Sequence, residues 1–164
     1  MVNLEFTQKH EQHFERHFDS NMDDISLTLK CHLLLEEMLR DFCSKIVPQP
    51  QYLADSRFTF AQVLDLSKAL YPAEIKLGFL AELWSVAEKI NRIRNMMAHS
   101  LDPDAVKLEA HKMAIMNTIK SRMADSAHLD FSTSLAWLLG AVNLMLQVGV
   151  THKNGEDYLS IPKK

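Results

Sequence analysis

The chain has 164 residues, the size of one domain, and 47% of them are hydrophobic, which is too high a proportion for a disordered protein. It contains four glycines and five prolines, few turn-forming residues for a β-sandwich or barrel, whereas its abundant Met, Leu, Ala, Lys and Glu favour helix. The formal net charge of −3 argues against a general nucleic-acid coat, because such proteins are usually basic, but it leaves room for a small basic site.

Hydrophobic residues recur at spacings of three and four along most of the chain, and this pattern predicts helices separated by proline and capping residues. Thr59 and Gln62 are the ends of a predicted capping box, and Asp102 with Pro103 is expected to open a later helix. The expected helices cover about residues 3–19, 23–47, 59–70, 78–98, 102–123 and 130–149.

These elements predict an all-α fold, an up-and-down bundle of about five to six helices in a single domain over residues 1–164. The core is expected within about residues 23–148, followed by a C-terminal tail over about 150–164. In that tail Asn154-Gly155 fits a type I′ turn, which predicts a short C-terminal hairpin between residues 150–152 and 158–161, with a frayed end as the alternative.

The most apolar stretch, Leu135 to Val150, is short for a membrane span and carries Asn143 and Gln147. It is apolar on two sides, which predicts a helix buried deep in the bundle or at a subunit interface. We therefore expect no membrane partner.

Cys31 and Cys43 are both expected on the second helix, about 18 Å apart along its axis, which is beyond the reach of a disulfide. They are predicted to be buried, reduced thiols. Because the first 20 residues also lack the apolar run of a signal peptide, we expect a cytoplasmic protein.

The end of the long helix over residues 78–98 carries the most informative pattern. Arg94 is predicted close to the apolar stripe of that helix, about 20° from Leu83. A guanidinium is not dehydrated without partners, so Arg94 is expected to reach carboxylates across the core or to face a polar cleft. His99 is expected on the first non-helical turn, folded back beside Arg94, with Asn95 capping the last carbonyls or orienting the imidazole.

The stretch from Arg94 to His99, which reads Arg-Asn-Met-Met-Ala-His, resembles the signature of the HEPN superfamily of small helical proteins. That signature is an Arg followed by Asn, Asp or His, with a His after a gap of four to six residues. The segment Leu33–Phe42 resembles an earlier helix of the family, and the resemblance covers about residues 23–123.

The resemblance implies a bundle that dimerises and places two Arg/His motifs across the interface, where active members cut RNA without metal or cofactor. It implies that His99 is a general acid/base, Arg94 an electrostatic clamp and Asn95 the residue that orients the imidazole. Lys89 and Arg92 are expected to guide the substrate. The chemistry suits these side chains, because an imidazole with a pKa near 6.5 exchanges protons with ribose oxygens and a guanidinium binds phosphate bidentately. RNA and a second copy of the chain are therefore the expected partners.

Other interpretations of the same residues remain open. Arg92 and Lys89 are cations near a helix C-terminus, where the helix dipole favours them, and Asn95 and His99 would then be capping groups. The chain would be a non-catalytic regulatory or adaptor module, or a bacterial regulator like the mannitol repressor, although the motif is not expected in the latter. Some HEPN toxins carry a Tyr two residues after the His, which a partner enzyme modifies; Leu101 stands there, so control by that route is doubtful, although an antitoxin or regulatory partner is still expected.

Two further clusters have less specific patterns. His10, His13 and His17 share one strip of the first helix, for which a solvated polar strip is favoured over a metal site. Glu36 and Glu37 point about 100° apart and do not form a carboxylate pair for catalysis.

One of these two glutamates is expected to meet Arg94 across the bundle. Arg40 and Asp41, which follow on the same helix, are interpreted as surface charges.

Overall fold

The computed structural model describes residues 3–123 and 129–155, and in these ranges it contains seven α-helices and no strand. The helices are α1 (Glu5–His17), α2 (Asp24–Ile46), α3 (Gln51–Ala54), α4 (Phe60–Leu70), α5 (Leu80–His99), α6 (Ala105–Lys120) and α7 (Phe131–Lys153). The all-α bundle predicted from the sequence is confirmed. Five to six helices were predicted and seven are described. The helix that was not predicted is α3, a single turn of four residues in a segment that was expected to be a loop.

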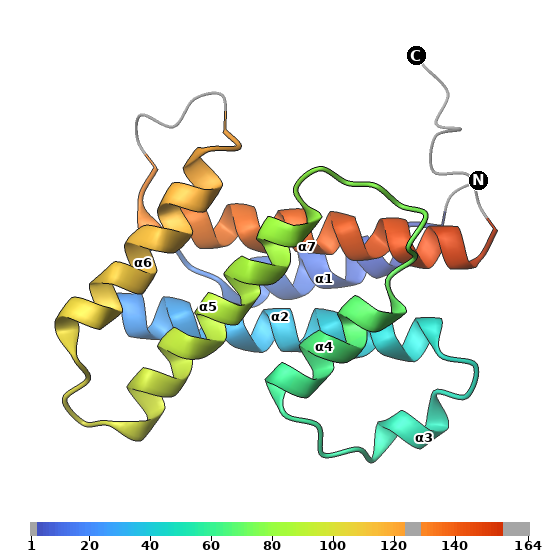
Figure 1. The fold of residues 1–164 in the computed structure, drawn as a ribbon, viewed down its shortest axis with the longest axis horizontal. Coiled ribbons are helices and arrows are strands. Elements are labelled where there is room, and N and C mark those ends of the chain that lie inside the picture. The colour runs from blue at the N-terminus through green and yellow to red at the C-terminus, as the bar shows by residue number, and fades with distance from the viewer. Residues whose placement is uncertain (1–2, 124–128, 156–164) are drawn as a thin grey trace.

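Two layers of helices cross each other in Figure 1. Helices α2 and α7 run along the long axis of the molecule with α1 beside them, and α4, α5 and α6 lie diagonally across this layer. Helix α2 contacts α1, α4, α5 and α7, so it is the central element of the bundle. Some polar side chains of α2, among them Thr28 and His32, are therefore buried against neighbouring helices.

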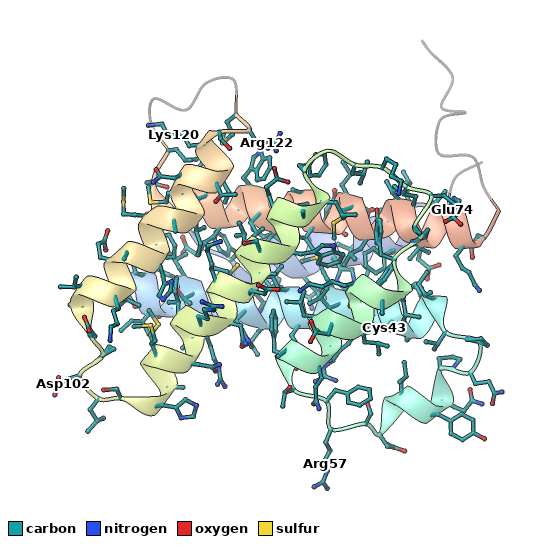
Figure 2. The ribbon with its side chains drawn as sticks, in the orientation of Figure 1. Cys43, Arg57, Glu74, Asp102, Lys120 and Arg122 are labelled. Atoms are coloured by element: carbon teal, nitrogen blue, oxygen red, sulfur yellow. The ribbon has the colours of Figure 1, made fainter. Side chains whose placement is uncertain are left out.

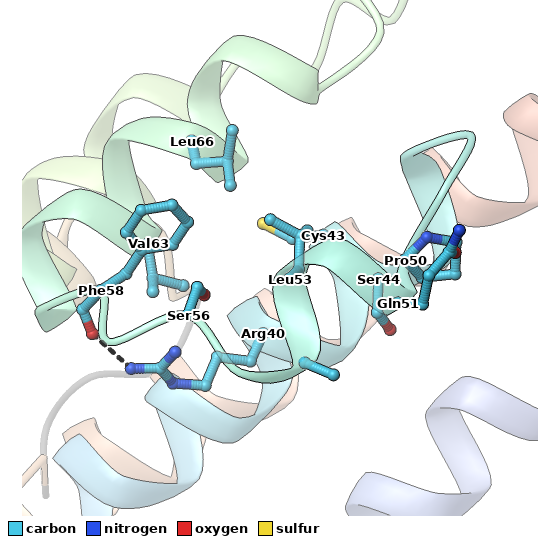
Figure 3. Close-up of a pocket in the computed structure, with 11 residues that line it drawn as sticks. Arg40, Cys43, Ser44, Pro50, Gln51, Leu53, Ser56, Phe58, Val63 and Leu66 are labelled. Carbon is cyan, nitrogen blue, oxygen red and sulfur yellow. Dashed lines mark hydrogen bonds between the residues drawn. The ribbon is translucent and has the colours of Figure 1, made fainter.

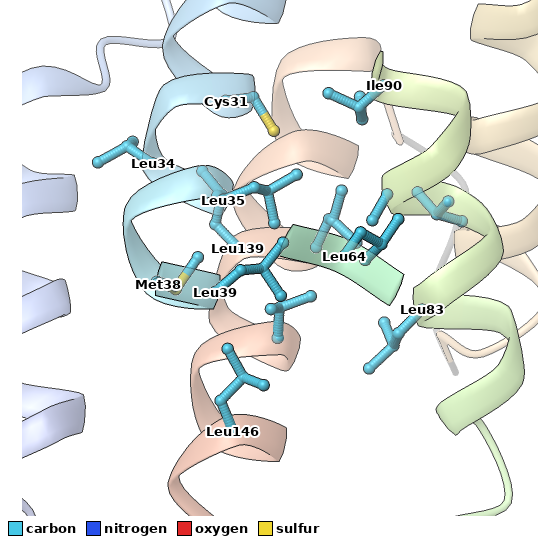
Figure 4. Packing of buried hydrophobic residues seen from close by; sticks show 14 of the residues in the cluster. Cys31, Leu34, Leu35, Met38, Leu39, Leu64, Leu83, Ile90, Leu139 and Leu146 are labelled. Carbon is cyan, nitrogen blue, oxygen red and sulfur yellow. The ribbon is translucent and has the colours of Figure 1, made fainter. Parts of the chain in front are cut away.

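The hydrophobic core lies between α2, α5 and α7 (Figure 4). Leu35 of α2, Ile90 of α5 and Leu146 of α7 are fully buried in it. Burying a side chain of this size contributes about 1.5–3 kcal/mol relative to leaving it exposed, so the apolar stripes determine which face of each helix turns inward. The same cluster includes Phe6 of α1 and Val150, so the core extends beyond the expected range of 23–148, by a whole additional helix at its N-terminal end.

Helix α7 contacts α1, α2, α5 and α6, and its side with Leu135, Leu138 and Val142 is buried, whereas on its second apolar side Trp137 and Ala141 are partly buried and Leu144 is 50% exposed. This is the buried helix predicted for residues 135–150. It is also the one described helix long and apolar enough to cross a membrane, and 61% of the relevant window is buried inside the bundle. The core helix of a folded bundle has the same signature, so the expected lack of a membrane partner stays a prediction.

Helix starts follow the local chemistry of the sequence, with one shift. The capping box at the start of α4 is confirmed: the Thr59 hydroxyl accepts the Gln62 N–H, and the Gln62 amide oxygen accepts the Thr59 N–H. The prediction that Asp102 caps α6 is wrong, because the cap is Asp104, whose carboxylate accepts the Lys107 N–H at 3.0 Å. Asp102 lies five residues before Lys107, too far along the chain to cap its N–H, whereas Asp104 lies three residues before it, which is the usual spacing of a cap.

The predicted C-terminal hairpin is wrong for its first strand, because residues 150–153 form the last turn of α7. Burial of Val150 and Thr151 in the bundle favours helix there over a free strand. Asn154 keeps helical angles, and Gly155 has a φ of 71°, the left-handed conformation in which helices commonly end. Asn154-Gly155 therefore ends a helix instead of turning a hairpin. The second predicted strand, residues 158–161, lies outside the described residues.

Candidate functional site

The candidate site occupies the C-terminal half of α5. The helix forms there because Leu83, Ile90 and Ile93 make a buried stripe, which turns the polar residues between them toward its flanks. At its other end, Glu82 in the first turn pairs with Arg122, just after α6. Figure 2 shows that the turn carrying Asp102, which follows the motif, lies at the end of the α5–α6 pair opposite to Arg122.

His99 is the last residue of α5, and its side chain is exposed. The prediction that it lies on a non-helical turn and folds back beside Arg94 is wrong. The chain leaves the helix one residue later, at Ser100, which is extended with a φ of −141°. Five residues of helix separate Arg94 and His99 by about 140° around the axis and about 7.5 Å along it. The two side chains therefore diverge within one chain.

Arg94 is half-buried, and its guanidinium Nη1 donates to the amide oxygen of Asn95 at 3.2 Å. Among the described residues no carboxylate lies within ion-pair distance of Arg94, so the expected pairing with a glutamate is wrong. Glu36 pairs instead with Arg40, at 2.7 Å, because the two are one turn apart on α2. The alternative expectation, that Arg94 faces a polar cleft, stays a prediction; Arg94 lies near enough to His32 of α2 for its charge to act on that imidazole, at a junction between α2 and α5.

The two predicted substrate-guiding cations, Lys89 and Arg92, lie one turn apart on α5 and about 60° from each other around its axis. Arg92 is exposed and only about 20° from His99 around the helix, with Asn95 between them. Lys89 donates to the hydroxyl of Ser85 at 2.7 Å and is turned away from the motif. Neither cation has a carboxylate partner in the described ranges. The helix thus presents Arg92, Asn95 and His99 on one side, whereas Arg94 lies about 160° around the axis from Arg92, close to the buried stripe.

His32 of α2 completes the junction, and it was missed by the analysis of the sequence. Its side chain is 7% exposed, and Nε2 donates to the amide oxygen of Asn91 at 3.2 Å. The imidazole packs on the ring of Phe60 with 4.3 Å between centroids, and Nδ1 lies 3.9 Å from a carboxylate oxygen of Glu36. A signal was available, because His32 falls on the buried side of α2 between apolar residues.

Burial is the largest cause that lowers the pKa of His32 from its ordinary value, and the positive charge of Arg94 acts in the same direction. The hydrogen bond with Asn91 and the charge of Glu36 oppose this change without reversing it. The imidazole is therefore held in its neutral form, beside an arginine whose charge no carboxylate neutralises.

On the opposite flank of α2, the histidines of α1 meet single carboxylates. His10 Nε2 lies 2.9 Å from Asp41 Oδ2, and His13 Nδ1 lies 2.9 Å from Glu37 Oε1. No group of three or more His, Cys, Asp or Glu side chains in residues 3–123 and 129–155 is arranged to hold a metal ion. His17 extends the strip, its ring 6.3 Å from that of His13.

Asp41 is not the surface charge that the sequence suggested, since its side chain is only 15% exposed. Burial alone would raise the pKa of this carboxyl, but hydrogen bonds from His10 and Lys9 lower it overall. The α1 flank is thus an assembly of closed pairs with an evident structural role.

Comparison of the chain with protein families, with characterised proteins and with solved structures finds no match. A functional proposal therefore rests on the arrangement of the motif residues on α5 and of His32 on α2, together with the resemblance of the motif to the HEPN signature.

Proposed function

We propose that this protein is a metal-independent endoribonuclease of the toxin or phage-defence type, acting as a homodimer of HEPN-like chains. One observation carries the proposal: Arg92 and Arg94 lack carboxylate partners among the described residues, and they lie at the same helix end as an exposed imidazole, His99. An unpaired guanidinium is suited to bind a phosphate, because its charge and its N–H donors are available to the phosphate oxygens.

In the proposed reaction His99 takes the proton of a ribose 2′-hydroxyl, whose oxygen then attacks the adjacent phosphorus. The bond from phosphorus to the 5′-oxygen breaks, and this leaving oxygen receives a proton. Arg94 binds the non-bridging phosphate oxygens, whose negative charge grows in the transition state, while Asn95 holds its guanidinium. The products are a 2′,3′-cyclic phosphate and a free 5′-hydroxyl.

A second copy of the chain is part of the proposal, because Arg94 and His99 diverge within one chain. When two such helix ends face each other, Arg94 of one chain can meet His99 of the other, and the second imidazole can protonate the leaving group. Exposed apolar side chains support such a contact. Leu29 and Leu33 flank His32 on α2, and Leu101 follows the motif with its side chain fully exposed.

The test is incubation of the purified protein with total RNA and tRNA in EDTA, with end-group analysis of the products. Arg94→Ala and His99→Ala are each expected to lower the cleavage rate by about 100-fold or more. Matched controls are Arg57→Ala and His17→Ala, which remove exposed side chains away from the motif and should cleave like the wild type. Cyclic phosphate ends in the reactions of the wild type and the two controls, and their absence from the reactions of both motif variants, would support the proposal.

Mixing the two inactive variants tests the shared site. An Arg94→Ala chain paired with a His99→Ala chain retains one Arg94–His99 pair but lacks the second imidazole, so a random mixture should recover activity up to about one quarter of that of the wild type. No recovery would contradict the composite site. If neither the wild type nor the variants cleave any substrate, the catalytic proposal is overturned, and the alternative is a non-catalytic regulatory or adaptor module that binds a partner through the same face.

A further inference from the structure

A cavity of about 400 Å³ lies between the C-terminal half of α2, the short helix α3 and the start of α4 (Figure 3). No residue of the motif on α5 lines it. A cavity of this size falls within the range typical of small-molecule sites. The chain between α2 and α4 passes through α3. Side chains of this segment do not fill the space beside Cys43 of α2 and Val63 of α4, and the cavity remains there.

The walls of the cavity are mostly apolar. Leu53 of α3, Phe58 of the following loop, and Val63 and Leu66 of α4 face it. Cys43 adds a thiol that is almost fully buried and lies 3.3 Å from the hydroxyl of Ser67. Burial raises the pKa of this thiol, so it is an uncharged part of the wall. Walls of this kind accommodate a hydrocarbon chain.

One edge of the cavity is polar, and its free groups are hydrogen-bond donors. The Arg40 guanidinium donates from Nε and Nη2 to Glu36, and from Nη2 to the carbonyl oxygen of Phe58 at 2.6 Å. Its Nη1 has no partner among the described residues, and neither does the hydroxyl of Ser56. Figure 3 shows Arg40, Ser56 and Phe58 together at this edge. The donors call for an acceptor, and a carboxylate with two oxygens matches them best.

We propose that this cavity binds a medium-chain carboxylate, with its hydrocarbon tail between Leu53, Val63 and Leu66 and its head group on Arg40 and Ser56. This inference does not depend on the proposed nuclease activity, since no residue of the motif lines the cavity.

The first test is titration of the full-length protein with decanoate, below the concentration at which it forms micelles, measured by calorimetry. We expect saturable binding of one molecule per chain. Ala54 lines the cavity from an exposed position on α3, so Ala54→Trp should fill it and weaken binding by about tenfold or more. The control Ala54→Ser should bind like the wild type. Absence of saturable binding to the wild type, or equal binding to Ala54→Trp, overturns the proposal.

A second test addresses the head group. Decyltrimethylammonium has the same tail, but its head accepts no hydrogen bond, so it should bind at least about tenfold more weakly than decanoate, whose oxygens can accept from Arg40 Nη1 and Ser56. Arg40→Gln should remove most of this difference, and circular dichroism checks that the variant is folded. Amide NMR signals of Leu53, Ser56 and Val63 should shift on addition of decanoate. Equal affinity of the two amphiphiles for the wild type, or shifts confined to another surface, overturns the assignment.

Discussion

The two flanks of α2 carry similar residues but differ in how their charges are balanced. Facing α1, buried His10 meets the carboxylate of Asp41, and Lys9 joins the same carboxylate at 3.1 Å. Facing α5, buried His32 meets the neutral amide of Asn91, and the nearby cation, Arg94, meets the neutral amide of Asn95. The side chains on the first flank are hydrogen-bonded to a carboxylate, whereas those on the second are hydrogen-bonded to amides, and the nearest carboxylate oxygen of Glu36 lies 3.9 Å from His32, beyond hydrogen-bond distance.

This difference separates a structural cluster from a candidate binding site. A carboxylate that already accepts from two side chains has little to offer a ligand, and removing it would leave a buried group without its partner. An amide satisfies the hydrogen bonds of His32 or Arg94 without neutralising charge, so the cation remains available to an anion. The α5 flank therefore has the electrostatic character that the α1 flank lacks, although both carry histidines.

The largest effect on stability is expected on the α1 flank. Asp41→Ala leaves the buried His10 imidazole without its partner and should lower the free energy of unfolding by about 2 kcal/mol, measured in urea at pH 7. The control Glu37→Ala removes a more exposed partner of His13 and should cost no more than about 1 kcal/mol. Similar losses for both variants would break the comparison.

The same pair has a defined pH dependence. Because the pKa of Asp41 is lowered in the folded protein, its contribution is complete above the ordinary value of about 3.9 and is lost as the pH falls through the lower pKa. The excess stability of the wild type over Asp41→Ala should therefore persist at pH 5 and shrink in stronger acid.

A smaller effect, at higher pH, is expected on the α5 flank. The folded protein lowers the pKa of His32, so below about pH 6.5 the unfolded chain binds more protons and stability falls as the pH is lowered toward the folded pKa. His32→Gln keeps a donor for Asn91 but does not titrate. Its stability should change less between pH 7 and pH 5 than that of the wild type, whereas His17→Gln, at an exposed position, should follow the wild type. Parallel curves for all three proteins would show that His32 titrates normally.

The smallest effect on stability is expected for Arg94. Arg94→Gln leaves no described carboxylate without a partner, so the free energy of unfolding should change by less than about 0.5 kcal/mol. The charge of Arg94 lowers the pKa of His32, so the variant should raise that pKa in an NMR titration. Arg92→Gln, which removes an exposed cation from the same helix, is the control and should leave the pKa of His32 unchanged. A large loss of stability in Arg94→Gln would mean that this side chain is structural.

Much of the bundle could be predicted because the signals are local. The capping box of Thr59 and Gln62 and the Asp130 cap of α7 involve residues within one turn, so the sequence alone specifies them. The apolar stripes of α2, α5 and α7 likewise identify the faces that turn inward, because helical spacing is a property of the chain itself. The misplaced start of α6 and the predicted hairpin show where local signals compete, since two aspartates flank Pro103 and Asn-Gly serves both turns and helix ends.

The sequence by itself thus determined the all-α class, most helix boundaries and the position of Arg94 near the end of one helix, whereas it placed His99 outside that helix. The tertiary structure decided which groups meet: His32 with Asn91, His10 with Asp41, and Arg94 with no described carboxylate. It also decided that α3 stands away from α4 and leaves a cavity beside Arg40. The physical reason is that helix spacing and caps depend on residues within one turn, whereas pairing, burial and pKa depend on neighbours that only packing brings together.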